Sequence, residues 1–319
     1  MNLDQPHLVV MGAGAMGGLF GGLLAEGGLR VTLVDAWAEH IAAMRAQGGL
    51  RMVGVGGDRI IPLTATTDVA SIPAADVVFF QCKAYANEAA ATSARHLFGN
   101  GTVAISFQNG LGNEARIAAV LGPANVIGGL TAQAGLVEAP GMVRNYGDLP
   151  THIGEMAGGL SDRTTRLAAA FTSHGLPVTA SPEIKREKWK KLLGNVALGA
   201  ISAVTDMRSF EIMQVPELQT TVFRLVDEAA QVAAADGVVL DTEGARSVLM
   251  KLIDTTGGGT GNAKSSMRED IIRRRRTEID TIHGAVAALG RTYGIATPTL
   301  DAMVAVVKGV EAMALAAGR

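Results

Sequence analysis

The chain has 319 residues, a length that favours two domains over one. Its 28 Lys and Arg against 30 Asp and Glu leave a net charge of −2, which with only 4% aromatic residues argues against binding to nucleic acid or to an anionic membrane. A hydrophobic content of 48% excludes a disordered or fibrous protein, and the single cysteine, Cys82, excludes an intrachain disulfide and a cysteine zinc cluster. We therefore expect a cytoplasmic protein without a metal site.

The first long uncharged stretch, residues 6–25, has the length of a membrane span, about 20 residues. Its glycines dilute its hydrophobicity, however, and Asp4 precedes it where a signal peptide would carry a positive charge. We interpret the stretch instead as part of a strand–helix–strand unit of a soluble domain.

A dinucleotide-binding turn is predicted inside this stretch. A buried strand over 7–11 leads into a glycine-rich turn, a helix follows to about Glu26, and a second strand over 31–34 ends on Asp35. A G-x-G-x-x-G pattern in this context indicates a turn that holds a pyrophosphate at the helix N-terminus. The predicted cofactor-binding residues are Gly12, Ala13, Gly14, Ala15, Met16 and Gly17.

Asp35 lies at the carboxyl end of the second strand, where an acidic side chain accepts hydrogen bonds from the adenosine ribose hydroxyls and repels a 2′-phosphate. The sequence therefore favours NAD(H), with NADP(H) as the alternative. A second reading of Asp35 is a cap for the helix expected over 36–47.

Strands and helices continue to alternate along the next part of the chain. Residues 50–65 predict a hairpin insertion, and two buried strands over 76–81 and 103–108 lead into Lys83 and Asn109. Because ligands bind at the carboxyl ends of strands in open α/β sheets, both residues are candidate cofactor contacts. The plainer alternatives are a solvated lysine and an Asn-Gly turn.

The pattern changes to long helical periods after Pro182. We predict an α/β protein with a Rossmann-type doubly wound sheet over 1–182 and an all-helical domain over 183–319. Residues 255–261 form a glycine-rich candidate substrate loop. The four arginines at 273–276 read as a solvated helix face, with an anion contact as the minor alternative. The expected helices cover 183–200, 216–235, 242–254, 265–293 and 298–317.

Lys191 and Asn195 stand one turn apart on the first of these helices, away from the face that carries Trp189. Two polar groups in this arrangement bracket a carbonyl, as hydride transfer to a ketone requires. The alternative is a charged surface in which Glu187 pairs with Lys191.

The chain resembles the ketopantoate reductase family (2-dehydropantoate 2-reductases) over nearly its whole length. The resemblance is carried by GAGAMG at 12–17, Lys83, QNGLG at 108–112, KLLGN at 191–195, SSM-x-x-D at 265–270 and RTEID at 276–280. It implies a Rossmann domain and a helical domain with the active site in the cleft between them. It also implies reduction of the ketone of 2-dehydropantoate to (R)-pantoate, a step towards pantothenate and coenzyme A.

The resemblance also implies roles for single residues. Lys191 matches the general acid, Asn195 a substrate-binding residue, and Ser266 a contact to the substrate carboxylate. Glu278 matches an acid that contacts the cofactor end and helps to orient the lysine. On one continuous helix Ser266 and Glu278 would be about 18 Å apart, so we expect them to serve different parts of the site. Asn109 and Lys83 match residues near the nicotinamide and the cofactor phosphates, and Ala134 matches a further cofactor contact.

Three features depart from the family pattern. Gly199 stands where the family commonly has a second substrate asparagine, and residues 205–211 do not match the rim expected for pantoate. The best-known members prefer NADPH and carry a basic residue where this chain has Asp35. A divergent β-hydroxyacid or opine-like dehydrogenase therefore stays open as an alternative, and a non-catalytic dinucleotide sensor as a lesser one. The expected partners are a small 2-oxoacid and, as one option, a second copy of the chain.

Overall fold

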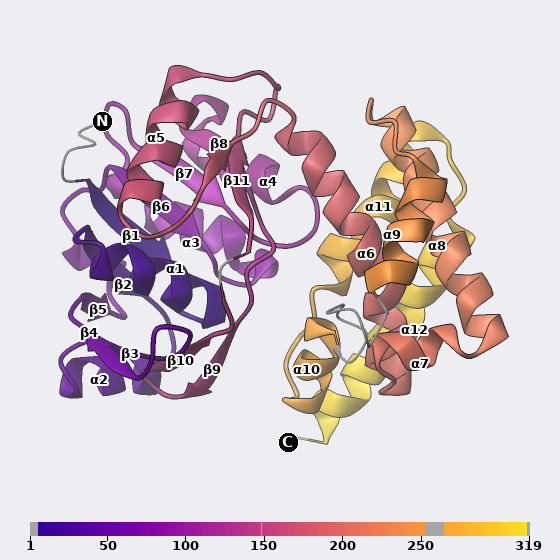
Figure 1. Ribbon diagram of the computed structural model, residues 1–319, viewed down its shortest axis with the longest axis horizontal. Coiled ribbons are helices and arrows are strands. Elements are labelled where there is room, and N and C mark those ends of the chain that lie inside the picture. Colours follow the sequence, from indigo (N-terminus) through magenta and orange to yellow (C-terminus); the bar gives the residue numbers. More distant parts are fainter. Residues whose placement is uncertain (1–5, 148, 253–264, 318–319) are drawn as a thin grey trace. The chain divides into compact units, whose positions relative to one another are not determined.

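The computed structural model describes residues 6–147, 149–252 and 265–317. The chain forms two compact units (Figure 1). The first consists of Met1–Gln108 and Asn113–Lys185, and the second of Arg186–Arg319 together with the short segment Asn109–Gly112. That short segment follows a strand of the first unit but packs with the second. The predicted loop over 255–261 lies outside the described residues.

An eight-stranded sheet in the order β12-β11-β8-β7-β6-β1-β2-β5 forms the middle of the first unit. Strand β1 pairs in parallel with β2 on one side and with β6 on the other, so the strand order reverses there. Ligands bind at such a switch point in open α/β sheets. The strands are β1 His7–Met11, β2 Arg30–Val34, β5 Thr64–Thr66, β6 Val77–Phe80, β7 Val103–Ser106, β8 Val126–Thr131, β11 Thr151–Gly154 and β12 Thr179–Ala180.

Helices cover both faces of this sheet, as a doubly wound fold requires. Along β1, Leu8 and Val10 belong to one hydrophobic cluster with helices α1, α2 and α5, whereas Val9 and Met11 belong to another with α3 and α4. Burial on both faces explains why the strand reads as a continuous apolar run. The helices are α1 Ala15–Glu26, α2 Ala38–Ala46, α3 Asn87–Ser93, α4 Asn113–Leu121 and α5 Asp162–Ser173.

The hairpin predicted over 50–65 is confirmed in β3 Leu50–Gly54 and β4 Arg59–Ile61, which pair antiparallel. It belongs to a second sheet, in the order β4-β3-β10-β9, with β9 Gly135–Ala139 and β10 Met142–Asn145. This small sheet packs on α1, where a Cβ added to Gly18 would lie 2.9 Å from a methyl of Val143. The sheet thereby buries the face of α1 that is turned away from the large sheet.

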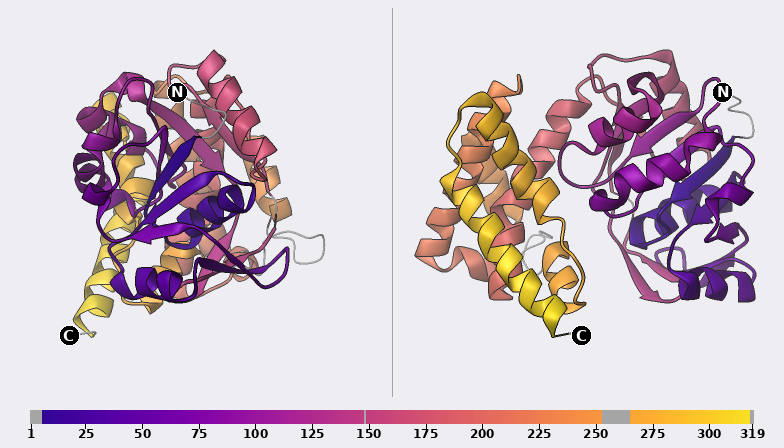
Figure 2. Two further views of the ribbon diagram at one scale, coloured as in Figure 1. Left: turned by 90° about the vertical axis from the view of Figure 1, so that its left-hand side faces the viewer. Right: turned by 180° about the vertical axis from the view of Figure 1, so that it is seen from behind.

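The second unit is helical in its described part, so the predicted fold class is confirmed. Its core is built on α6 by Trp189, Leu192 and Val196, which pack with side chains of α8 and α11. Helices α11 and α12 lie side by side (Figure 2). The helices are α6 Ile184–Thr205, α7 Ser209–Met213, α8 Pro216–Ala235, α9 Thr242–Leu252, α10 Ser266–Ile272, α11 Ile279–Tyr293 and α12 Pro298–Ala316.

The single helix predicted over 265–293 is wrong, because the chain forms α10 and α11 with a break between them. Arg274 adopts φ +52, and the N–H groups of Arg274 and Arg275 donate to the carbonyls of Ile271 and Asp270. These two hydrogen bonds form a Schellman motif at the C-terminus of α10, here with arginine in the left-handed position. The arginine run therefore follows a helix instead of lying inside one. Four consecutive charged residues leave no apolar side chain to anchor a helical turn to the core.

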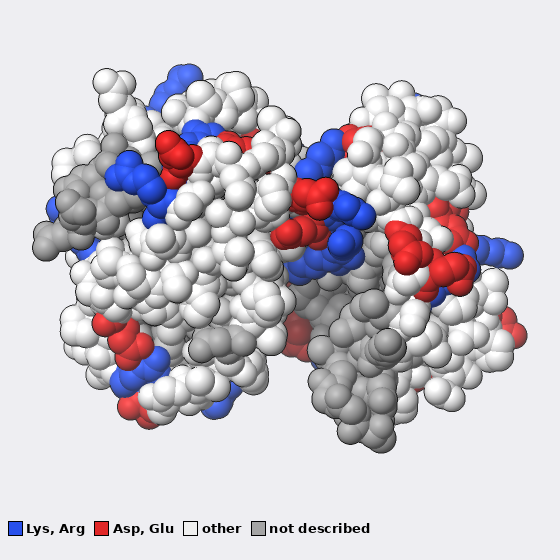
Figure 3. All heavy atoms as spheres, turned by 45° about the horizontal axis from the view of Figure 1, so that its top comes forward, with Lys and Arg blue, Asp and Glu red and all other residues white. Residues whose placement is uncertain are grey.

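Surface charges are mixed in sign. Arg51 pairs with Asp58 and Arg163 pairs with Glu155, and on the face shown in Figure 3 basic and acidic side chains lie interspersed. Among the described residues, none of the helices has both the length and the apolar character that crossing a membrane demands.

Candidate active site

The glycine-rich turn joins β1 to α1 at the switch point of the sheet. Gly12 has φ +103, and a Cβ there would lie 2.4 Å from the backbone nitrogen of Cys82. A Cβ on Gly17 would lie 1.8 Å from the Gly12 carbonyl oxygen. A Cβ on Gly14, by contrast, would meet no atom of the described residues within 4 Å beyond its chain neighbours. Packing within the protein thus requires glycine at positions 12 and 17. Gly14, at the N-cap of α1, keeps open space before the helix.

The Asp35 carboxylate accepts two backbone hydrogen bonds. Ala13 donates to Oδ2 at 2.7 Å and Trp37 donates to Oδ1 at 2.9 Å. The alternative that Asp35 caps a helix is not what the structure has, because α2 has Trp37 at its N-cap and no side chain bonded there. Asp35 instead ties the end of β2 to the glycine-rich turn. Each carboxylate oxygen keeps a further lone pair for a ligand hydroxyl.

His40 supports the same turn, and sequence reasoning missed it. The Gly141 N–H donates to Nδ1 of His40 at 2.9 Å, so Nε2 carries the proton and donates to the Ala13 carbonyl at 3.0 Å. Trp37 stacks on the His40 ring with centroids 4.8 Å apart and an interplanar angle of 7°. Since Gly141 lies 101 positions from His40, no local pattern signals this contact.

Two further predicted cofactor contacts lie in the first unit. Lys83 follows β6 as the half-buried residue before a short 3-10 helix, Ala84–Ala86. Ala134 is exposed in the connection between β8 and β9, and a Cβ on the next residue, Gly135, would lie 3.1 Å from the Ala15 carbonyl oxygen. This connection therefore lies against the glycine-rich turn. Beside Ala134, the buried Gln133 amide has no hydrogen-bond partner in the described part of the chain, a feature that the sequence did not indicate.

In the second unit, Lys191 Nζ donates to Asn109 Oδ1 at 2.9 Å. The turn that carries Asn109 is fixed to α11, because the Leu111 N–H donates to the Thr281 carbonyl at 2.9 Å. Gly110 allows this approach: a Cβ there would lie 2.2 Å from the same carbonyl oxygen. The Asn-Gly pair therefore serves as a tight turn and also presents its amide to the lysine.

Burial lowers the pKa of Lys191 to about 8, and the positive charge of Lys188 adds to this effect. A lysine with an ordinary pKa holds its proton too tightly to act as an efficient acid near neutral pH. The protein thus brings the proton affinity of this ammonium close to the range in which general acids work.

Asn195 and Gly199 follow Lys191 on the same side of α6, each one helical turn further on. Asn195 is half-buried, and its amide makes no hydrogen bond to any residue that the structure describes. Ser266 is the exposed first residue of α10, and its neighbour Ser265 donates to the Gly199 carbonyl at 3.0 Å. This bond brings the start of α10 next to the side of α6 that carries Lys191, Asn195 and Gly199.

Glu278 is half-buried at the N-cap of α11, one turn before Thr281, to which the Asn109 turn is bonded. The expected separation of about 18 Å from Ser266 assumed one continuous helix. That assumption is wrong, because the break after α10 reorients the chain between the two residues.

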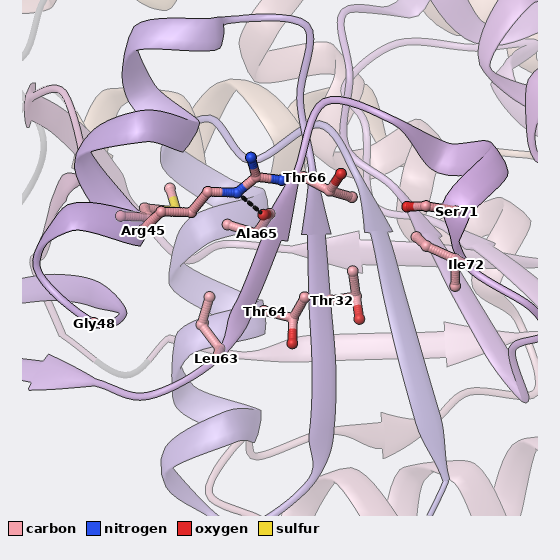
Figure 4. Close-up of a pocket in the computed structure, with 10 residues that line it drawn as sticks. Thr32, Arg45, Gly48, Leu63, Thr64, Ala65, Thr66, Ser71 and Ile72 are labelled. Carbon is pink, nitrogen blue, oxygen red and sulfur yellow. Dashed lines mark hydrogen bonds between the residues drawn. The ribbon is translucent and has the colours of Figure 1, made fainter.

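A pocket elsewhere in the first unit contains none of the predicted site residues. It lies at β5, the last strand at one edge of the large sheet, and its lining includes Thr32, Thr64 and Thr66. Figure 4 shows Arg45 beside it, and the Arg45 Nε–H donates to the Ala65 carbonyl at 2.8 Å. This bond satisfies an outward carbonyl of the edge strand, a protective arrangement at sheet edges.

Two family models match the chain: "Ketopantoate reductase PanE/ApbA" over residues 8–158, and "Ketopantoate reductase PanE/ApbA C terminal" over residues 183–311. The 2-dehydropantoate 2-reductase of Halobacterium salinarum is 33% identical over 306 residues, covering 95% of this chain and 98% of that protein. The enzyme of the same name from Pyrococcus abyssi is 31% identical and covers 96% and 98%.

Solved structures agree with these matches. A ternary structure of D-mandelate dehydrogenase with NADH and anilino(oxo)acetate superposes with a TM-score of 0.90 at 27% identity, covering 97% of this chain and 99% of that one. A PanE/ApbA family ketopantoate reductase from Ralstonia eutropha superposes with a TM-score of 0.88, also at 27% identity and with the same coverage.

Proposed function

Since this chain belongs to the ketopantoate reductase family, we propose that it reduces the ketone of 2-dehydropantoate, or of a close 2-oxoacid, by hydride transfer from a nicotinamide cofactor. The product is (R)-pantoate. The observation that carries the proposal is the lysine–asparagine pair, because it holds a partly buried ammonium of lowered pKa in a fixed orientation.

The first unit fits a dinucleotide. The space in front of Gly14 and the free N–H groups at the start of α1 suit a pyrophosphate. Lys83 and Ala134 stand at the same end of the sheet and add cofactor contacts. When bound, the reduced nicotinamide supplies the hydride that adds to the ketone carbon.

We further propose NAD(H) over NADP(H). The Asp35 carboxylate, held by two backbone N–H groups, has lone pairs left for the ribose hydroxyls and repels a 2′-phosphate. The mandelate dehydrogenase whose structure superposes was solved with NADH, which supports the same choice.

Lys191 supplies the proton in this reaction. As the carbonyl oxygen gains negative charge, the ammonium transfers one proton to it and becomes a neutral amine, which is protonated again from solvent. The Asn109 amide oxygen accepts one ammonium hydrogen and thereby orients the group. The positive charge also stabilises the developing alkoxide before the proton moves.

Asn195, Ser266 and Glu278 complete the proposed site. The Asn195 amide, which has no partner among the described residues, is one turn from the lysine and suits binding of the substrate. The Ser266 hydroxyl is accessible for the substrate carboxylate. Glu278 orients the lysine and contacts the cofactor end.

A second candidate is a 2-hydroxyacid dehydrogenase for a bulkier substrate. The observation in its favour is Gly199, which has no side chain on this face of α6, and where a Cβ would meet only one atom of the described residues within 4 Å. The open space suits a larger group beside the ketone, and a mandelate dehydrogenase superposes well on this chain.

Steady-state rates with NADH and with NADPH, measured on 2-dehydropantoate, phenylglyoxylate and a panel of aliphatic 2-oxoacids, test both candidates. We expect the highest kcat/KM for 2-dehydropantoate with NADH. Turnover of phenylglyoxylate alone would support the second candidate, and no turnover of any 2-oxoacid would overturn both. A clear preference for NADPH would overturn the role given to Asp35.

A further inference from the structure

We propose that Gln108 is a positioning residue for hydride transfer: its side-chain amide holds the carboxyl ends of β6 and β7 together, and thereby fixes Lys83 and Asn109. The inference rests on the proposed function. It adds to the site a residue that acts through Lys83 and Asn109 instead of touching the reacting atoms.

Gln108 is buried at the point where the backbone ladder between β6 and β7 ends. The last paired residues are Phe80 and Ser106, so the Cys82 carbonyl lies beyond the ladder. Gln108 Nε2 donates to that carbonyl, and a side chain thus holds the two strands together past their last backbone pair. Ligands bind beyond the carboxyl ends of strands in open α/β sheets, so this bond lies at the edge where the cofactor is expected.

Hydrogen bonds fix the direction in which the Gln108 amide points. The Cys82 carbonyl only accepts, so the atom that contacts it is Nε2, and the Ser106 hydroxyl donates to Oε1 at 2.8 Å. Nε2 also donates to Asn87 Oδ1 at 2.7 Å, and Asn87 Nδ2 donates to Asn113 Oδ1 at 3.0 Å. One consistent set of donors and acceptors therefore runs through three buried amides to the first residues of α3 and α4.

Stability alone does not explain why amides occupy this place. Buried amides lose their hydration, and apolar side chains of the same shape in place of both partners can be nearly neutral for stability. The adjoining core is indeed apolar, with Val78, Phe80 and Ala104 in one cluster. What the amides add is direction, because each hydrogen bond requires a defined distance and angle. We infer that the network serves to place the two strand ends accurately.

The chain that leads into Lys83 is held from two sides. On one side Gln108 binds the Cys82 carbonyl. On the other side the glycine-rich turn packs against the same residue, since a Cβ on Gly12 would lie 2.4 Å from the Cys82 nitrogen. The preceding N–H, that of Gln81, donates to the carbonyl of β1 residue 11 at 2.8 Å. Lys83 therefore extends from a backbone that has little freedom to shift.

Gln108 also fixes the start of the turn that carries Asn109. Asn109 is its chain neighbour and accepts the hydrogen bond from the Lys191 ammonium. Displacement of Gln108 would thus disturb the cofactor-side lysine through Cys82 and the lysine-orienting amide through the chain. Transfer reactions are sensitive to such shifts, because a misplacement of about 1 Å can lower a rate by about 10².

Gln108→Met tests the role, because methionine is similar in length but has no donor. We expect the rate constant for hydride transfer, measured in a single turnover at saturating NADH and 2-dehydropantoate, to fall about tenfold or more. The Kd for NADH should rise about fivefold or more, because Lys83 loses part of its contact with the cofactor phosphates. Gln108→His keeps one N–H donor near the Nε2 position and should restore the rate constant to within about threefold of wild type.

Thr102→Val is the matched control. The buried Thr102 hydroxyl donates to the Ala75 carbonyl at 2.8 Å, so it joins the segments of β6 and β7 at their amino ends, away from the proposed site. Both variants lose a buried bond from a side chain to a carbonyl, and both should have a lower Tm. A residue that serves stability alone lowers the Tm and the active fraction, but not the rate constant of the folded protein. Thr102→Val should therefore keep the wild-type rate constant and Kd within about twofold.

These measurements separate the role of Gln108 from the proposed function. A rate constant and a Kd within about twofold of wild type in Gln108→Met, or equal losses in Thr102→Val, would overturn the role of Gln108. Should Gln108→Met fail to fold, Gln108→Asn, which withdraws the amide by one carbon–carbon bond, replaces it under the same criteria. Absence of hydride transfer from the wild type to any 2-oxoacid would instead overturn the proposed function, and the NADH Kd values would still test Gln108.

Discussion

Lys191 Nζ donates to Asn109 Oδ1 over 2.9 Å, although the two residues lie 82 positions apart in the chain. Asn109 comes directly after the strand region of the first unit, yet residues 109–112 pack with the second. The turn is held there by the bond from Leu111 to Thr281. The amide therefore positions the lysine from within its own unit, and the pair does not depend on how the two units are placed.

Removal of the lysine should abolish most of the activity. We predict that Lys191→Ala lowers kcat by about 10² or more, the range expected for the loss of a positioned general acid. The control is Lys190→Ala, which removes the same charge from an exposed neighbouring position and should leave kcat unchanged. A near-normal kcat in Lys191→Ala would show that the lysine does not donate the proton to the substrate.

Gly14→Ala should separate folding from cofactor binding. Because a Cβ at Gly14 would meet no atom of the described residues within 4 Å beyond its chain neighbours, the free energy of unfolding should fall by no more than about 1 kcal/mol, the cost of alanine at a helix N-cap. The added methyl occupies the pyrophosphate space, so the Kd for NADH, measured by fluorescence or calorimetry, should rise at least tenfold. Gly12→Ala should instead destabilise the fold, since its Cβ would overlap the Cys82 backbone. Unchanged NADH affinity in Gly14→Ala would contradict the cofactor placement.

Asp35→Ala should shift the cofactor preference. We predict a lower kcat/KM with NADH and a higher ratio of NADPH to NADH activity, because the ribose partner is lost and the repulsion of a 2′-phosphate disappears. Glu39→Ala, on an exposed position of α2, removes the same charge and serves as the control. An unaltered ratio in Asp35→Ala would leave Asp35 with a purely structural role at Ala13 and Trp37.

His283 should make the fold sensitive to acid. It is fully buried on α11, and burial lowers its pKa to about 4 from 6.5, so the unfolded chain binds its proton first as the pH falls. Above pH 6.5 the ring is neutral in both the folded and the unfolded chain. As the pH falls from 6.5 to 4, the free energy of unfolding should therefore decrease by roughly 3 kcal/mol. Urea unfolding across this range should give a smaller pH dependence for His283→Gln than for wild type. An exposed control, His96→Gln, should behave as wild type; equal slopes in all three proteins would contradict the assignment.

Local patterns predicted the first unit well. The turn at 12–17 and the strand before it were predicted because tight packing leaves little choice: Gly12 and Gly17 have no room for a side chain. The start of α8 at Pro216 was equally local, since proline favours the first helical position. Elements whose conformation is set by residues close together in the chain were therefore predictable from sequence.

Contacts between distant segments were not predictable. The pairing of β3 with β10 and the support of the turn by His40 join segments far apart in the chain. The break between α10 and α11 was missed because Arg274 takes a left-handed conformation that arginine seldom adopts. The bond between His283 and the Val196 carbonyl depends on two helices packing together, and the sequence alone shows only a histidine on a helix.

The pH dependence of kcat/KM for 2-dehydropantoate reduction tests the central claim, that Lys191 gives its proton to the substrate. With a pKa of about 8, the lysine is protonated below that pH and loses its proton above it. We predict a rate that is constant below pH about 8 and falls about tenfold per pH unit above it, with this limb absent from the residual activity of Lys191→Ala. A wild-type profile that stays flat to pH 10, or the same falling limb in Lys191→Ala, would contradict the account.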